Sequence, residues 1–222
     1  MFLTMASLFG ASCAVPPARA GDIPLPAIDV PVEAGETVRK SVVASGCFWC
    51  SEAVFENVAG VSDVVSGYAG DTKENATYEK VGAGRTRHAE AIEITYDPNA
   101  VTYGTLLRAF FATHDPTTKD RQGPDRGPQY RSAIFYANED ERKVAEAYIK
   151  QLDDAKVFGA PIVTTLEPIK SGQFYVAEGY HQDFARGNPA HPYIRQNVPD
   201  KLKKLEKLLD SGKMQIPTGA ME

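Results

Sequence analysis

The chain has 222 residues, a formal net charge of −5 at pH 7 and 43% hydrophobic residues, values typical of one soluble globular domain with terminal extensions. The mildly acidic balance, without a stripe of Lys or Arg, gives nucleic-acid binding no support. A domain of this size needs no disulfide to hold its core, so its three cysteines are not expected to be structural staples.

The N-terminal segment MFLTMASLFGASCAVPPARA, residues 1–20, resembles a secretory signal peptide. Its apolar run is too short to span a bilayer and is followed by the small-x-small triplet Ala18-Arg19-Ala20. We therefore expect cleavage after Ala20, export to the periplasm and no stable membrane insertion, although no Lys or Arg precedes the apolar run. The alternatives are an uncleaved cytoplasmic leader and a lipid anchor at Cys13, which Gly10 disfavours because such signals usually carry Leu there.

Residues 21–38 are rich in proline and small residues, which predicts a linker or an arm wrapped on the surface, outside the fold. The catalytic domain is expected over 39–212, followed by a flexible tail over 213–222. It opens with a β-branched strand over 40–46 and a helix over 47–58.

Alternation, helical spacing and turn signals predict the other elements in chain order. These are strands over 60–70 and 88–98, a helix over 102–115, a long loop over 116–130, a strand over 131–137, a helix over 138–152 capped by Asn138, a strand over 161–169, a short helix over 176–187 and a closing helix over 198–212. The Lys-rich segment 201–213 predicts a solvated helix face. Because several strands follow one another closely, the pattern favours an α+β two-layer sandwich with a ferredoxin-like mixed sheet and flanking helices.

Two of the cysteines lie three positions apart in the stretch GCFWC. A strand that ends in Gly46 and turns into a helix places Cys47 at the helix N-terminus, where free backbone N–H groups and the helix dipole favour an anion. We therefore predict that Cys47 has a lowered pKa and reacts as a thiolate. Cys50 lies on the same helix face, within reach of a disulfide after modest adjustment.

Other interpretations compete with a catalytic pair. A zinc site would need further ligands, but the chain has no second CxxC and its histidines are isolated from one another, so we expect no metal and no cofactor. Buried inert cysteines are common. A thioredoxin-type redox protein usually carries small or turn-forming residues between its cysteines, whereas Phe48 and Trp49 form an apolar wall. That wall indicates a substrate with a small apolar group next to the atom under attack.

The chain resembles the A-type peptide methionine sulfoxide reductases in six ordered blocks: GCFWCSEAVF, VSGYAG, NATYEKV, HAEAIEITYDP, HDPTTKDRQGPDRGPQYRSAIFY and AEGYHQDF. The resemblance covers residues 41 to 195. It implies a two-layer α+β enzyme that uses a thiol to reduce the S-epimer of methionine sulfoxide, free or in proteins. It also implies that Phe48 and Trp49 hold the S-methyl group of the substrate.

A sulfoxide oxygen leaves only after protonation, and strand parity singles out one donor. Glu90 shares a face with Ile92 and Ile94, whereas Glu93 lies on the opposite face. Burial on the apolar face and a nearby thiolate would both raise the pKa of Glu90 and keep it protonated near neutral pH. The resemblance assigns the acid to the same residue, although a structural role fits the residues alone equally well.

The resemblance further implies that Tyr78, Asp125 and Tyr130 surround the sulfoxide oxygen. Phenol groups can donate to that oxygen, and a carboxylate can orient a water or a donor. By its Gly and Pro neighbours alone, Asp125 would be a turn residue. His181 stays open between an active-site role and a helix-surface or core histidine.

The expected reaction leaves Cys47 as a sulfenic acid, which Cys50 resolves to a disulfide because no cysteine follows it in the chain. Thioredoxin or an equivalent dithiol would then reduce the disulfide. We expect the protein to be a monomer. Two other classes stay open: a thiol–disulfide exchange protein with a CxxC centre, and a binding module for Met-rich surfaces.

Overall fold

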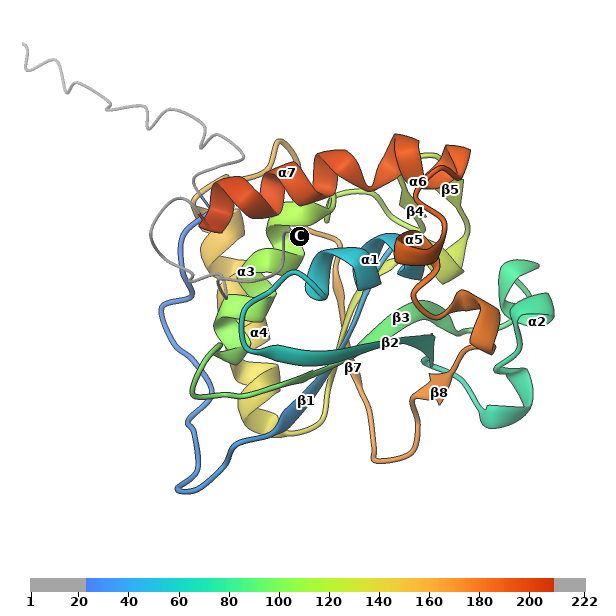
Figure 1. Cartoon of the computed structure of the whole chain (residues 1–222). Coiled ribbons are helices and arrows are strands. Elements are labelled where there is room, and N and C mark those ends of the chain that lie inside the picture. Colours follow the sequence, from blue (N-terminus) through green and yellow to red (C-terminus); the bar gives the residue numbers. More distant parts are fainter. Residues whose placement is uncertain (1–22, 210–222) are drawn as a thin grey trace, which may run out of the picture.

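A six-stranded mixed sheet in the order β7-β6-β1-β3-β2-β8 forms the framework of the computed structural model, which describes residues 23–209 (Figure 1). Its strands are β1 (Arg39–Ser45), β2 (Val61–Ala69), β3 (Ala89–Tyr96), β6 (Ser132–Tyr136), β7 (Thr165–Pro168) and β8 (Tyr175–Val176). A separate ribbon pairs β4 (Arg121–Gln122) with β5 (Asp125–Arg126). The expected signal peptide over 1–20 and the expected tail over 213–222 lie outside the described residues.

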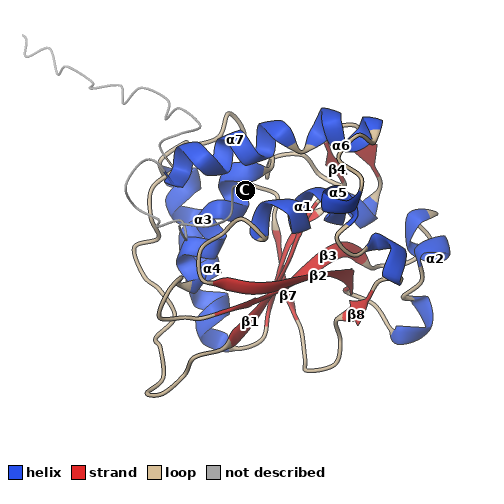
Figure 2. Ribbon diagram, in the orientation of Figure 1, coloured by secondary structure: helices blue, strands red, loops and turns tan. Residues whose placement is uncertain are grey.

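The helices are α1 (Phe48–Phe55), α2 (Tyr78–Gly82), α3 (Tyr103–Thr113), α4 (Glu139–Asp154), α5 (Phe184–Gly187), α6 (Pro192–Asn197) and α7 (Pro199–Leu208). Short 3-10 turns occupy η1 (Lys73–Asn75), η2 (Pro128–Tyr130) and η3 (Gly179–His181). Helices α1, α3 and α7 lie on one side of the sheet (Figure 2). No helix between residues 23 and 209 is long and apolar enough to cross a membrane.

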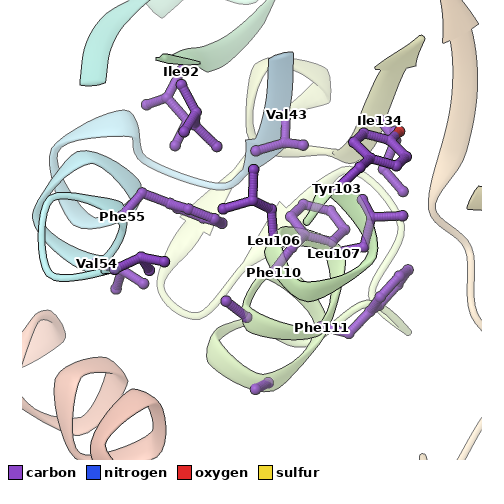
Figure 3. Close-up of a cluster of buried hydrophobic side chains, with 14 of the residues drawn as sticks. Val43, Val54, Phe55, Ile92, Tyr103, Leu106, Leu107, Phe110, Phe111 and Ile134 are labelled. Atoms are coloured by element: carbon purple, nitrogen blue, oxygen red, sulfur yellow. The ribbon is translucent and has the colours of Figure 1, made fainter. Parts of the chain in front are cut away.

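Alternate residues of the central strands divide the core between the two faces of the sheet. Val43 of β1 and Ile92 of β3 are register partners on the helix-covered face, where they join the large apolar cluster around α3 (Figure 3). Val42 and Ala91 belong to a smaller cluster on the other face, which Phe174 and the loop after β7 cover. The expected α+β two-layer sandwich is therefore confirmed.

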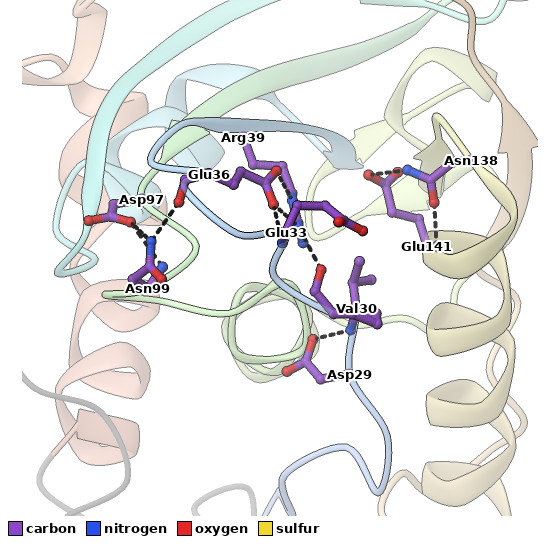
Figure 4. Close-up of polar contacts among 10 residues, drawn as sticks. Asp29, Val30, Glu33, Glu36, Arg39, Asp97, Asn99, Asn138 and Glu141 are labelled. Atoms are coloured by element: carbon purple, nitrogen blue, oxygen red, sulfur yellow. Dashed lines mark hydrogen bonds and ion pairs between the residues drawn. The ribbon is translucent and has the colours of Figure 1, made fainter.

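Residues 23–38 form an arm bound to the surface rather than a free linker. Ile23 at its start is only 2% exposed and belongs to the large core cluster. The guanidinium of Arg108 in α3 donates to the carbonyl of Ile23 at 2.6 Å, and the hydroxyl of Tyr148 in α4 donates to the carbonyl of Pro24 at 2.6 Å. Further along the arm, the amide of Asn99 donates to the carbonyl of Glu36 at 2.7 Å (Figure 4). The expectation that all residues up to 38 lie outside the fold is therefore wrong for this arm.

Most predicted elements form where the sequence pattern placed them, and one does not. The side-chain oxygen of Asn138 accepts from the amide of Glu141 at 2.9 Å, which confirms the predicted N-cap of α4. The single short helix predicted over 176–187 is instead divided into β8, η3 and α5, because Asp183 adopts a left-handed conformation with φ 55° before α5. In α7, the buried Leu205 and Leu208 give the amphipathic pattern predicted from the sequence.

Candidate active site

Three strand ends meet at one edge of the sheet and bring distant parts of the sequence together. Ser45 at the end of β1 is the register partner of Ser132 at the start of β6, so the chain just after β1 lies beside the chain just before β6. The antiparallel pairing of β1 with β3 brings the start of β3 to the same edge. Cys47, Tyr130 and Glu90 occupy these three positions and therefore belong to one site.

The turn between β1 and α1 sets the position of the first thiol. Gly46 has a φ of 93°, a region that residues with a Cβ rarely adopt, and a Cβ here would lie 2.5 Å from the Cβ of Gln122. Cys47 follows as the N-cap of α1. Cys47 and Cys50 are both buried free thiols and belong to the same cluster of side chains. The predicted dithiol pair is therefore assembled at the start of α1.

The ionisation of the pair differs from the sequence-based expectation. Burial raises the pKa of Cys47 well above its usual value, and the neighbouring Cys50 thiol and Glu90 carboxyl raise it further. The first amide of α1, that of Phe48, donates to a carboxyl oxygen of Glu90 at 3.2 Å, so it has a partner other than the thiol. The predicted lowering of the Cys47 pKa is therefore wrong in the substrate-free state. The hydrogen bond with Cys47, together with the charge of Lys201, lowers the pKa of Cys50.

Glu90 faces the helical layer, as strand parity predicts. It is 2% exposed and lies behind α1. Burial raises the pKa of Glu90 to about 8, and the negative charges of Asp125 and Cys50 act in the same direction. The carboxyl therefore carries a proton at neutral pH and can donate it.

The two rings between the cysteines differ in burial, and both lie beside His181. Phe48 is fully buried, with its ring centroid 5.9 Å from that of Tyr68 and 4.9 Å from that of His181. Trp49 is only partly buried; its ring centroid lies 5.7 Å from that of His181, and it stacks on Phe184 with the two ring centroids 3.7 Å apart. The two rings thus belong to one aromatic cluster next to Cys47.

His181, whose role the sequence left open, holds the indole of Trp49. The indole nitrogen of Trp49 donates to Nδ1 of His181 at 3.1 Å. An indole N–H can only donate, so Nδ1 is unprotonated and the neutral ring carries its proton on Nε2. Burial lowers the pKa of His181, which favours this neutral form.

Two of the three predicted oxygen-binding residues, Tyr78 and Tyr130, lie beside His181 and beside the cysteine cluster, respectively. Tyr78 is 38% exposed and its ring centroid lies 4.5 Å from that of His181. Tyr130 packs against the cluster that contains both cysteines. Burial raises the pKa of both phenols, and the charges of Glu90 and Cys47 raise it further, so both hydroxyls stay protonated as donors.

Two residues at the site carry no recognisable sequence signal. The hydroxyl of Tyr193 in α6 donates to Asp125, and Tyr193 packs against the cluster that contains Cys47 and Cys50. Burial raises the pKa of Asp125, while this hydrogen bond and the charge of Lys201 lower it. Lys201 in α7 interacts electrostatically with both thiols, although its segment predicts a solvated face. The one local feature consistent with burial of the Lys201 side chain is its position three residues after the apolar Val198, on the same helix face.

Among residues 23–209, no group of three or more His, Cys, Asp or Glu side chains gathers in a way that could hold a metal ion. The arrangement around Cys47 instead combines a thiol pair, a protonated carboxyl, phenol donors and an aromatic cluster.

Comparison with known proteins gives one consistent result. The peptide methionine sulfoxide reductase family model matches residues 39–213. The chain is 53% identical over 169 residues to peptide methionine sulfoxide reductase MsrA 2 of Mesorhizobium japonicum, covering 76% of this chain and 86% of that protein. It is 47% identical over 171 residues to the MsrA of Thermus thermophilus, covering 77% of this chain and 95% of that protein.

Solved structures agree with the sequence comparison. Reduced Mxr1 from Saccharomyces cerevisiae has a TM-score of 0.65 and 33% identity, covering 70% of this chain and 88% of that chain. Methionine sulfoxide reductase A of Corynebacterium diphtheriae has a TM-score of 0.60 and 32% identity, covering 83% of this chain and 92% of that chain. The chain therefore belongs to the peptide methionine sulfoxide reductase family, as an enzyme of the A type that reduces methionine sulfoxide with thiols.

Proposed function

We propose that Cys47 is the nucleophile and Glu90 the general acid in the reduction of the S-epimer of methionine sulfoxide. The observation that carries this assignment is the protonated, buried carboxyl of Glu90, hydrogen-bonded to the backbone of Phe48 next to the Cys47 thiol. The Cys47 sulfur attacks the sulfoxide sulfur while Glu90 protonates the sulfoxide oxygen. Methionine leaves as the reduced product, and the oxygen ends on Cys47 as a sulfenic acid.

The rings of Phe48 and Trp49 recognise the substrate by binding its S-methyl group. Burial of one methyl contributes about 0.8 kcal/mol and a sulfur–aromatic contact about 0.3–1.5 kcal/mol. These contributions orient the sulfoxide without binding it tightly, so a large share of the selectivity comes from the oxygen side.

The sulfoxide oxygen is bound by the protonated hydroxyls of Tyr78 and Tyr130, with Asp125 orienting a donor or a water. Such donors stabilise the negative charge that develops on the oxygen before it takes the proton of Glu90. Burial raises the pKa of both phenols above the usual value of a tyrosine, so both hydroxyls remain available as donors.

Recycling begins when the Cys50 thiolate attacks the sulfenic sulfur, forming a Cys47–Cys50 disulfide and releasing water with one proton taken up. The position of both cysteines in the first turn of α1 and in one side-chain cluster supports a disulfide between them. An external dithiol of the thioredoxin class then reduces the disulfide by thiol exchange.

An assay of methionine-S-sulfoxide reduction with dithiothreitol tests these roles. We expect Cys47→Ser to be inactive and Glu90→Gln to be slowed about 100-fold or more, the range of general acid catalysis. Cys50→Ser should release methionine once and fail with thioredoxin. Full activity of Cys47→Ser would refute the mechanism, and reduction of the R-epimer alone would refute the stereochemical assignment.

For the leader, we propose export with cleavage after Ala20, supported by the short apolar run and the Ala18-Arg19-Ala20 triplet. An exported enzyme needs a reducing relay in an oxidising compartment. The mass of the mature chain tests this: a chain that retains Met1 would exclude cleavage.

A further inference from the structure

Lys201 differs from Lys203, another lysine of α7, in the exposure of its side chain. The side chain of Lys203, two residues on, is 69% exposed and pairs with Asp200 at 3.9 Å. Lys201 is instead partly buried, and its ammonium donates to the carbonyl of Thr113 at 3.1 Å. Thr113 is the last residue of α3, where unpaired carbonyls and the helix dipole favour a cation. The ammonium is thus held at a fixed point beneath the active site.

Lys201 lies on the part of α7 that packs in the cysteine cluster. Val198 lies one turn before it, and both Val198 and Leu202 pack in the cluster that contains Cys47 and Cys50. A lysine ammonium has three donors, and the Thr113 carbonyl takes one. The remaining positive charge interacts with Cys50, Cys47 and Asp125.

We propose that Lys201 is a positioning residue for the recycling half of the reaction, whose ammonium stabilises the thiolate of Cys50. This inference deepens the proposed function and depends on the assignment of Cys50 as the resolving thiol. In the first recycling step, the thiolate of Cys50 attacks the sulfenic sulfur of Cys47, and the leaving hydroxide takes up a proton to become water. In the second step, an external thiolate cleaves the disulfide and Cys50 leaves again as a thiolate.

The second step also depends on the pKa of Cys50. Attack of the incoming thiolate on Cys47 expels Cys50, and thiol exchange is faster when the leaving thiol has the lower pKa. The lowered pKa of Cys50, to which the charge of Lys201 contributes, fits both roles.

Other titratable groups lie near Lys201 and modify the electrostatic effect of its charge on Cys50. They come from the start of α1, β5, α7 and the end of α3: Cys47, Cys50, Asp125, Lys204 and His114. Burial lowers the pKa of His114 to about 3, so this ring is neutral near pH 7. Asp125 competes with Cys50 for the positive charge, and Lys204 opposes it.

The test separates sulfoxide reduction from recycling in chains that also carry Cys13→Ser. We compare Lys201→Met with Lys201→Arg and with the exposed control Lys203→Met. Single-turnover methionine release should stay within about twofold of the parent in Lys203→Met, and in Lys201→Met it should slow less than disulfide formation does. Disulfide formation at about pH 7 should slow roughly tenfold in Lys201→Met, the effect of one pKa unit on Cys50, and recover at higher pH. Lys201→Arg should restore most of the rate.

The thiolate itself gives a second readout. In chains that lack Cys13 and Cys47, the ultraviolet absorbance of the Cys50 thiolate should appear at higher pH after Lys201→Met but not after Lys203→Met. If Lys201→Met does not fold, Lys201→Gln, which keeps a donor for the Thr113 carbonyl, gives the same comparison. Disulfide formation with the same rate and pH profile in Lys201→Met and Lys203→Met would overturn the role of Lys201. Absence of methionine release from the parent would instead overturn the proposed function.

Discussion

Glu90 and the two thiols show how burial controls ionisation at this site. Glu90 lies on the helix-facing side of β3 and accepts one backbone hydrogen bond, which does not offset the loss of water. The same burial raises the pKa of Cys47 and favours its neutral thiol. Because the thiolate is the form that oxidants attack, this burial disfavours oxidation of Cys47 in the substrate-free protein.

The raised pKa of Glu90 predicts a specific pH dependence of stability. A glutamate has a pKa of about 4.3 in the unfolded chain and about 8 in the folded one. Between these values the folded state binds more protons, so the free energy of unfolding falls as pH rises, by about 1.4 kcal/mol per pH unit from this group. In Glu90→Gln this contribution is absent.

Urea unfolding from about pH 5 to about pH 8 measures the difference between parent and Glu90→Gln. We expect the difference to change steadily with pH in favour of the variant. Glu93→Gln, on the opposite face of the same strand and paired with Lys40 at 2.6 Å, is the matched control and should leave the slope in place. Parallel stability curves for the parent and Glu90→Gln would show that Glu90 is ionised in the folded protein.

At the residue scale, the sequence predicts groups whose role follows from local spacing. The alternation of β3 is enough to orient Glu90, and the GCFWC spacing is enough to pair the cysteines. The pKa of Cys47 could not be predicted, because it depends on burial by elements distant in the chain. Tyr193 and Lys201 were missed for the same reason: only the docking of α6 and α7 onto α1 brings them to the thiols.

The turn between β1 and α1 is the element on which the geometry of the site depends most. Only Gly46 and Cys47 join β1 to α1, and this short turn places Cys47 at the start of the helix beside Glu90. Gly46 also lies against Gln122, whose register partner in the β4–β5 ribbon is Asp125. The turn therefore positions both the nucleophile and the ribbon that carries Asp125.

Gly46→Ala tests this coupling. A left-handed non-glycine residue costs about 1–3 kcal/mol, and the Cβ contact at 2.5 Å pushes on the Cβ of Gln122 rather than on a flexible side-chain end. We expect a stability loss of that size and a single-turnover rate reduced by about 10- to 100-fold, since small displacements of reacting groups are costly. Gly159→Ala, with open space around the added Cβ, is the control. An unchanged rate in Gly46→Ala would contradict the coupling.

Element prediction succeeds where a strong local pattern and the tertiary contacts agree. The Asn138 cap and the apolar stripe of α4 fall in this class. The segment over 176–187 has helix-forming residues, yet Ala177 donates to the carbonyl of Ser66 in β2 and the left-handed Asp183 interrupts the chain. Docking to a sheet edge overrides propensity there, which no local signal reveals.

At the scale of the whole molecule, the arm of residues 23–38 extends the fold beyond its catalytic layers. It crosses α3 and α4 and contributes Ile23 to the core. Proline and small residues predict such a path on the surface but not the burial of its first apolar side chain. The mature chain expected after cleavage at Ala20 would retain this contact.

Ile23→Ala measures what the arm contributes. Removing a buried isoleucine side chain costs about 2–5 kcal/mol, so the midpoint of urea unfolding should fall clearly. Ile28 in the same arm is 49% exposed, and Ile28→Ala should change stability by less than about 0.5 kcal/mol. The single-turnover yield of methionine should be unchanged in both folded variants. Equal stabilities would mean that the arm does not belong to the cooperative fold.

The proposed mechanism requires that the sulfur of Cys47 receives the sulfoxide oxygen. Cys50→Ser removes the resolving thiol, so the product of one turnover should accumulate. We would add methionine-S-sulfoxide without reductant, trap sulfenic acids with a selective carbon nucleophile, and locate the trap by peptide mass. The account predicts about one methionine per chain and a trap on the peptide that contains Cys47. Methionine release without a trapped oxygen on Cys47, or a trap on another residue, would contradict it.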